Sequence, residues 1–149
     1  MGTHASEWEG KMDFVEPYAF GAISLLVFVL IVLVQSALVG AGKAKAGVTP
    51  GSEPEADYEN ALYRANRSHQ NGTENMGAAV AVLVLCILAG VSAFWVNLLM
   101  ALFLAFRIVY VVIYAQSIGK PTQGVRTFVY VAGWAMLVIL AVLAIFALV

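Results

Sequence analysis

The sequence predicts an all-α membrane protein, a four-transmembrane-helix bundle that forms a single domain over residues 1–149. Apolar residues make up 62% of the chain and only 11% are charged, with a mean hydropathy of +0.88. These values lie outside the balance of a soluble domain. The apolar residues also fall in uncharged runs long enough to cross a hydrocarbon core of roughly 30 Å. A net charge of −1 argues against nucleic acid as a partner.

The first two helices are expected over residues 17–40 and 57–90. Residues 18–39 carry no charge, and glycines at positions 40, 42 and 47 follow them. A linker containing glycine, proline and acidic residues leads to the second helix. The uncharged part of that helix, residues 76–90, is shorter than the about 20 residues that a spanning helix needs. Polar residues of the second helix must therefore enter the membrane zone.

The third and fourth helices are expected over residues 93–118 and 123–148. Residues 76–106 are all uncharged, but one helix of that length would measure about 46 Å and is too long for one crossing. The chain must therefore fold back, most simply at residues 90–92, where Ser92 can cap the third helix. Gly119, Pro121 and Gly124 interrupt the chain before the fourth helix.

The distribution of cations predicts the orientation in the membrane. One side carries six cations in or beside its loops, and the other carries only Lys11; the six are Lys43, Lys45, Arg64, Arg67, Lys120 and Arg126. The positive-inside rule places the cation-rich side in the cytoplasm. We therefore expect a multi-pass protein of the bacterial inner membrane or the endoplasmic reticulum. The myristoylation pattern at Gly2 and the glycosylation patterns at Asn66 and Asn71 then lie on the wrong side for their enzymes.

Arg107 lies within the otherwise uncharged residues 94–118. A guanidinium at that depth is costly and marks a functional site or an ion pair. On the same helix Tyr110 and Tyr114 follow at positions i+3 and i+7, so all three side chains share one face. The fourth helix begins with a similar group, Arg126, Thr127 and Tyr130.

The second helix carries a polar stripe of Arg64, Arg67, Asn71 and Glu74 within an arc of roughly 80°. We expect this stripe to point into the bundle. Two interpretations stay open: Arg107 pairs with Glu74 as a structural lock, or the surplus of cations binds an anionic ligand. Gly72, in mid-helix, costs roughly 1 kcal/mol relative to alanine and marks either close helix packing or the approach of a ligand.

Residues 64–75, together with the pattern Arg107, Tyr110, Tyr114 and the group Arg126, Thr127, Tyr130, resemble the membrane-associated proteins in eicosanoid and glutathione metabolism (MAPEG). The resemblance covers most of the chain. It implies a homotrimer of four-helix chains, with glutathione as cosubstrate bound between neighbouring subunits. The other implied partners are membrane lipids and a lipophilic small-molecule substrate.

The resemblance also implies roles for individual residues. Glu74 would accept the amino group of glutathione, and Arg67 would meet a carboxylate. Arg126 stands where the family stabilises the thiolate, with Thr127 where the prostaglandin synthase has a serine. The full expected set has Arg126 and Thr127 as catalytic residues, and as glutathione-binding residues Arg67, Asn71, Glu74, Arg107, Tyr110, Tyr114, Arg126, Thr127 and Tyr130. Lys43 takes the place of an arginine that follows the first helix in some members.

The chain departs from the eicosanoid-producing members at three positions. Gln70 replaces an arginine of the prostaglandin synthase, Tyr110 replaces a histidine, and Asn75, in place of a tyrosine of the leukotriene synthase, is more similar to bacterial members. We therefore expect a glutathione transferase or peroxidase acting on lipophilic electrophiles or hydroperoxides, with isomerase activity within the family's range. The alternatives are a non-enzymatic lipid- or glutathione-binding member, and a small transporter using Arg107 and Glu74 as a relay.

The remaining reactive side chains have simpler interpretations. Cys86 is the only cysteine, lies in an apolar run and is expected to pack as a small hydrophobic residue. His69 lies at the edge of the polar stripe and is interpreted as solvated. Two histidines and one cysteine are too few and too far apart for a metal site.

Overall fold

The computed structural model describes residues 14–119 and 124–149, and four long helices account for most of them. A short 3-10 turn, η1 (Glu16–Tyr18), leads into α2 (Ala19–Lys45), followed by α3 (Ala61–Leu88), α4 (Ala93–Ala115) and α5 (Val125–Leu148). Each of the four α-helices is long and apolar enough to cross a membrane. The predicted all-α architecture, with four helices long and apolar enough to span a membrane, is therefore confirmed within the described residues.

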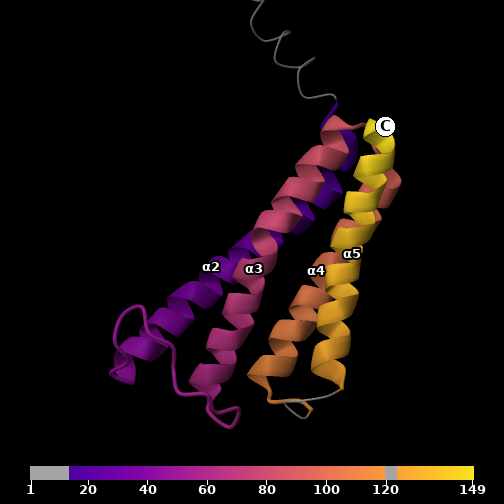
Figure 1. Cartoon of the computed structure of the whole chain (residues 1–149). Coiled ribbons are helices and arrows are strands. Elements are labelled where there is room, and N and C mark those ends of the chain that lie inside the picture. The colour runs from indigo at the N-terminus through magenta and orange to yellow at the C-terminus, as the bar shows by residue number, and fades with distance from the viewer. Residues whose placement is uncertain (1–13, 120–123) are drawn as a thin grey trace, which may run out of the picture.

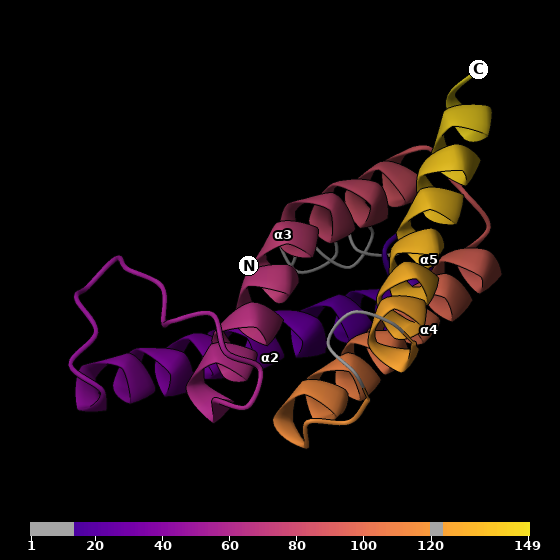
Figure 2. The same ribbon diagram turned by 60° about the horizontal axis from the view of Figure 1, so that its bottom comes forward.

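The helices run up and down across the bundle (Figure 1). The turn between α3 and α4 lies at the same end as the C-terminus, while the α2–α3 connection, the end of α4 and the start of α5 lie at the other end. Figure 2 turns this end toward the viewer, and by their contacts the central pair of helices is α3 and α4. Each of them packs against all the other helices, and α2 and α5 flank them.

Several helix boundaries differ from the expected ranges. Helix α2 continues through Gly40 to Lys45, so Gly40 lies inside the helix and does not end it. The chain turns only at Gly47, whose φ is +67°. Helix α3 begins at Ala61, four residues later than expected, where the Asn60 side chain accepts a hydrogen bond from the Leu62 amide at 2.8 Å. Helix α4 ends at Ala115 rather than 118. The expected start of the last helix, residue 123, lies outside the described residues.

The turn between α3 and α4 falls where residues 90–92 were expected to fold back. Gly90 has a φ of +68°, a conformation that suits a residue without a side chain. Ser92 occupies the N-cap position of α4, but its side chain makes no capping hydrogen bond. The glycine therefore forms the turn, and the expected serine cap is not made.

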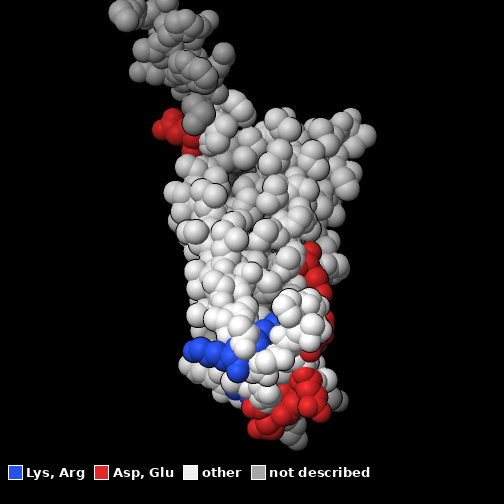
Figure 3. All heavy atoms as spheres, turned by 90° about the vertical axis from the view of Figure 1, so that its left-hand side faces the viewer, with Lys and Arg blue, Asp and Glu red and all other residues white. Residues whose placement is uncertain are grey.

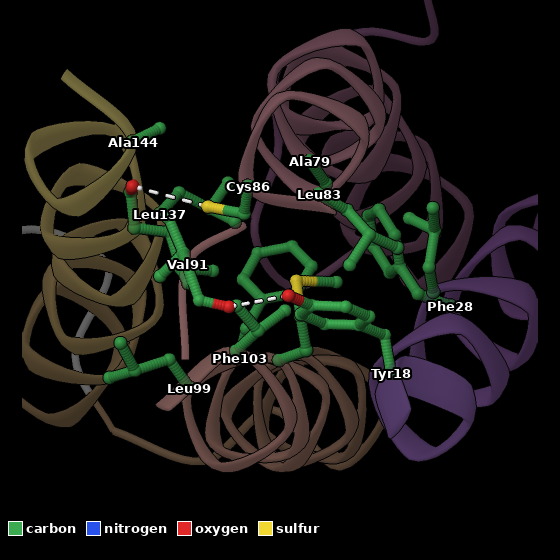
Figure 4. Packing of buried hydrophobic residues seen from close by; sticks show 14 of the residues in the cluster. Tyr18, Phe28, Ala79, Leu83, Cys86, Val91, Leu99, Phe103, Leu137 and Ala144 are labelled. Atoms are coloured by element: carbon green, nitrogen blue, oxygen red, sulfur yellow. Dashed lines mark hydrogen bonds between the residues drawn. The ribbon is translucent and has the colours of Figure 1, made fainter. Parts of the chain in front are cut away.

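The hydrophobic core lies in the half of the bundle near the α3–α4 turn (Figure 4). Phe28 of α2 meets Phe103 of α4 edge to face, with ring centroids 5.0 Å apart. Cys86 is fully buried, as expected for a packed hydrophobic residue, and its Sγ lies 3.4 Å from the Leu140 carbonyl. This packing fixes α2, α3, α4 and α5 relative to one another.

Hydrogen bonds join the start of α2 to the start of α4. The Asn97 amide accepts from the Gly21 backbone N–H and donates to the Pro17 carbonyl, both at 2.8 Å. The Tyr18 hydroxyl donates to the Val91 carbonyl at 2.6 Å (Figure 4). These contacts satisfy polar groups at a helix end, where backbone groups lack partners within the helix.

Charged side chains gather mainly at the end of the molecule that carries the two loops, below a broad uncharged band (Figure 3). The uncharged band includes many exposed large apolar side chains of α2, such as Leu26, Leu30 and Leu38. An apolar surface of this extent matches contact with lipid rather than with water. The polar groups of the candidate site lie toward the charged end.

Candidate functional site

A polar cavity of about 320 Å³ opens between α3, α4 and α5, on the side of the bundle toward the loops. The structure brings eight of the nine expected binding residues to its walls. They are Arg67, Asn71 and Glu74 of α3, Tyr110 and Tyr114 of α4, and Arg126, Thr127 and Tyr130 of α5. Their roles in binding and catalysis stay predictions.

Arg107 is the ninth expected residue, and it lies behind the cavity wall. Its side chain is buried, and Nη1 donates to Asn71 Oδ1 at 2.6 Å. The guanidinium also lies over the rings of Tyr110 and Tyr130, at 5.7 and 5.4 Å from their centroids. Arg107 therefore supports three wall residues and adds positive charge beneath them, without lining the cavity itself.

The alternative in which Arg107 pairs with Glu74 is not formed in this chain. The Arg107 guanidinium donates a hydrogen bond to Asn71, and Glu74 is exposed at the surface. Two guanidinium nitrogens of Arg107, Nε and Nη2, are buried and have no hydrogen-bond partner among the described residues. The charge at this depth is thus stabilised by an amide and aromatic faces instead of a carboxylate.

Arg126 is positioned by the first turn of α5 and by two aromatic rings. Its Nε donates to the Ile118 carbonyl at 3.0 Å, which ties α5 to the segment that follows α4. The guanidinium lies over Tyr58 and Tyr114, at 5.3 and 5.1 Å from the ring centroids. Its buried Nη1 has no partner within the described part of the chain. Arg126 therefore has an unused donor in a residue that lines the cavity.

The polar stripe on α3 is oriented differently from the expectation that it points into the bundle. Arg64 is buried, but Arg67 and Glu74 are exposed on the surface of the single chain. The face of α3 beside the stripe is the one that packs inward: a Cβ on Gly72 would lie 2.9 Å from Val32 Cγ2 of α2. Close packing with α2, rather than the approach of a ligand, thus explains this mid-helix glycine.

The three tyrosines form an aromatic wall of the cavity. Tyr110 and Tyr114 lie 4.6 Å apart between ring centroids, and Tyr130 lies 6.3 Å from Tyr110. Aromatic groups at these separations attract one another through their quadrupoles. The rings also present their faces to Arg107 and Arg126. The tyrosine rings therefore position Arg107 and Arg126 without neutralising their positive charge.

Two features of the site were missed by the interpretation of the sequence. The expected second helix, residues 57–90, included Tyr58 away from the polar stripe, but α3 begins at Ala61 and the Tyr58 ring lies against the Arg126 guanidinium. An apolar groove of about 280 Å³ runs between α3 and α5 and shares Glu74 and Tyr130 with the polar cavity. Its other walls are mostly apolar and comprise Asn75, Ala78, Val82, Trp134, Leu137, Val138 and Ala141.

Charge in and under the polar cavity is unbalanced. Arg67 and Arg126 line it, Arg107 lies behind it, and Glu74 is the one carboxylate among its lining residues. A surplus of guanidinium groups favours an anionic ligand, because arginine binds carboxylates with paired hydrogen bonds. Within the described residues, no three His, Cys, Asp or Glu side chains come close enough to hold a metal ion.

The fold and the site define an integral, multi-pass membrane protein with a cationic cavity between its helices. Comparison with family models gives the identity: the MAPEG family model matches residues 20–146, nearly the whole chain. The chain belongs to the MAPEG family. No curated protein matches the chain closely enough to be named as a relative.

Proposed function

We propose that this protein binds glutathione in the polar cavity and activates its thiol for attack on lipophilic electrophiles or hydroperoxides. Glutathione carries two carboxylates, one ammonium group and one thiol. The cavity offers complementary charge: two lining guanidinium groups, a third behind the wall, and one carboxylate. This match of charges in one cavity is the observation that carries the proposal.

Arg126 is the residue that we assign to thiolate stabilisation. A free thiol with a pKa near 8.5 is mostly protonated at neutral pH, and only the thiolate is strongly nucleophilic. A neighbouring guanidinium stabilises the thiolate by charge and hydrogen bonding. Arg126 lines the cavity together with Thr127, and its buried Nη1 has no hydrogen-bond partner among the described residues, so its positive charge is not paired there.

The reaction follows from the activated sulfur. The thiolate attacks an electrophilic carbon to form a thioether, and the electrophile either loses its leaving group or takes up a proton. Attack on the terminal oxygen of a hydroperoxide breaks the O–O bond, releases an alcohol after protonation and leaves a glutathione sulfenic acid, which a second glutathione converts to the disulfide and water. The apolar groove between α3 and α5 adjoins the polar cavity at Glu74 and Tyr130. It provides a surface on which a lipophilic substrate from the bilayer can lie next to the sulfur.

The exposed polar residues of α3 support a homotrimer. Arg67 and Glu74 lie on the outer surface of the single chain, in a helix that crosses the membrane. A charged side chain facing lipid at the centre of a helix costs about 2.5–3.5 kcal/mol on insertion scales. We propose that a second copy of the chain covers this face and encloses the cavity, in the trimeric arrangement of the family.

We further propose that the site faces the cytoplasm. Lys43, Lys45, Arg64 and Arg126 all lie at or near the loop end of the bundle, and such cations collect on the cytoplasmic side. An impermeant thiol reagent that reached a Ser92→Cys variant only from the cytoplasmic side would contradict this orientation.

The test of thiol activation is ultraviolet difference absorbance in the thiolate band, when glutathione is added to purified protein in detergent. We expect the band in the wild type and its loss in Arg126→Ala, while glutathione binding is partly kept. Lys45→Ala is the matched control, since Lys45 is an exposed cation that does not line the cavity. This control should keep the full band.

The other outcomes identify the alternatives. Glutathione binding without a thiolate band in the wild type would favour a non-enzymatic binding member of the family. Flux into liposomes without any thiol chemistry would favour a transporter, although the direct Arg107–Glu74 contact that a relay needs is not made here.

A further inference from the structure

We propose that Glu53 and Gln70 are positioning residues for Arg67, and that through Arg67 they set the affinity of the cavity for glutathione. This inference rests on the proposed function. The observation behind it is a chain of hydrogen bonds from the α2–α3 loop to the cavity wall. Arg67 Nη1 donates to Gln70 Oε1 at 3.0 Å, and Gln70 Nε2 donates to Glu53 Oε1.

The chain of hydrogen bonds has only one workable orientation of the Gln70 amide. Arginine is purely a donor and an ionised carboxylate purely an acceptor. The amide oxygen must therefore face Arg67, and the amide nitrogen must face Glu53. Both contacts are made in this way, so the amide is held at both ends and in turn holds one nitrogen of the guanidinium.

An amide in this position leaves the charge of Arg67 available. A carboxylate at residue 70 would pair directly with Arg67 and occupy it as a ligand would. Gln70 instead separates the guanidinium from the Glu53 carboxylate by one neutral group. Arg67 makes no further hydrogen bond within residues 14–119 and 124–149, so its other N–H groups can meet a carboxylate of glutathione in the cavity.

Arg67 needs such a restraint because it is exposed and borders two spaces. It lines the polar cavity of about 320 Å³ and also a second polar cavity of about 480 Å³. The second cavity is bordered by Glu53 and Gln70. A long, flexible side chain at this point loses conformational entropy when a ligand fixes it, and a prior hydrogen bond reduces that loss.

The loop that carries Glu53 is itself anchored. Lys43 Nζ donates to the carbonyl of Ser52, the residue next to Glu53, at 3.0 Å. The Ser52 backbone N–H donates to the Thr49 carbonyl, also at 3.0 Å. Lys43, expected from the resemblance to stand in for an arginine, thus holds the loop in this chain.

The experiment measures the dissociation constant of glutathione by calorimetry, with full-length protein in detergent. We expect Glu53→Ala and Gln70→Leu each to raise the dissociation constant about 3- to 10-fold, which corresponds to the net contribution of one ordinary hydrogen bond. Glu53→Gln keeps an acceptor for Gln70 and should bind nearly as the wild type does. Glu55→Ala is the matched control, an exposed carboxylate two residues along the loop.

A double-mutant cycle separates positioning from a general effect on the fold. In an Arg67→Leu background, Gln70→Leu should cause no further loss of affinity, because the chain of hydrogen bonds acts only through Arg67. Equal losses in both backgrounds would overturn the inference, as would unchanged affinity in Glu53→Ala and Gln70→Leu when the wild type binds glutathione. A wild type that does not bind glutathione would refute the proposed function, and this inference with it.

Discussion

Arg64 and Arg67 lie one helical turn apart on α3, yet only Arg67 is available to a ligand. Arg64 is buried and donates to three backbone carbonyls: Nε to Tyr114 at 3.0 Å, and Nη1 to Tyr58 and Glu59 at 2.8 Å each. It therefore joins the start of α3 to the end of α4. Arg67 is exposed and lines the cavity.

Substitution by leucine should separate the two arginines by their effects. Arg64→Leu removes one buried and two partly buried hydrogen bonds to carbonyls and should destabilise the protein by about 3 kcal/mol, seen as a lower thermal midpoint in detergent. Arg67→Leu should leave the midpoint unchanged and raise the glutathione dissociation constant about 10-fold or more. Equal midpoints for the two variants would contradict the structural role of Arg64.

Helical spacing in the sequence was enough to group most of the site residues, but it could not give their depth. The i, i+3 and i+7 spacing of Arg107, Tyr110 and Tyr114 correctly places them on one face of α4. The same spacing cannot show that Arg107 lies behind the wall, because that depends on the packing of α5 against this face. The contact of Tyr58 with Arg126 was also missed, because residue 58 was expected inside the second helix and the structure leaves it in the linker before α3.

Within a helix, the effect of a glycine on stability depends more on the neighbouring helix that it contacts than on the low helix propensity of glycine. Gly72 allows α3 to approach α2, since a Cβ there would lie 2.9 Å from Val32 Cγ2. Gly77 is in the same helix, but a Cβ there would meet nothing within 4 Å. Sequence alone does not distinguish these two glycines, because the neighbouring helix decides the outcome.

The two glycines give a matched pair of tests. Gly72→Ala should lower the thermal midpoint, because the branched Val32 side chain has little freedom to move away. Gly77→Ala should leave the midpoint unchanged or raise it, since alanine is the better helix former by up to about 1 kcal/mol. Adding Val32→Ala to Gly72→Ala opens space and should recover part of the loss. A lower midpoint for Gly77→Ala alone would contradict this account.

For the whole molecule, hydropathy and length were sufficient to predict four spanning helices. The backbone of a spanning segment must satisfy its own hydrogen bonds, so an apolar run of spanning length indicates a helix. The outward orientation of Arg67 and Glu74 was not predictable in this way. Periodicity finds the polar face of a helix, but it does not tell whether the chain itself or a second copy covers that face.

We therefore predict that the chain assembles as a trimer. Native mass spectrometry of the protein released from detergent should give three times the 15.9 kDa of one chain. Replacing the exposed Glu74 by leucine should weaken the trimer only if the partner meets that carboxylate with a polar group. A stable mass of 15.9 kDa in gentle detergent would show that the single chain leaves its cavity open.

The burial of Cys86 has a consequence for redox chemistry in the cell. Thiol–disulfide exchange requires an accessible thiolate that can reach the attacking or leaving sulfur. The only cysteine of this chain is fully enclosed between α3 and α5, against the Leu140 carbonyl. The folded protein therefore cannot form a mixed disulfide with oxidised glutathione. It can work in a pool of this tripeptide whose oxidation state changes, without being covalently modified by it.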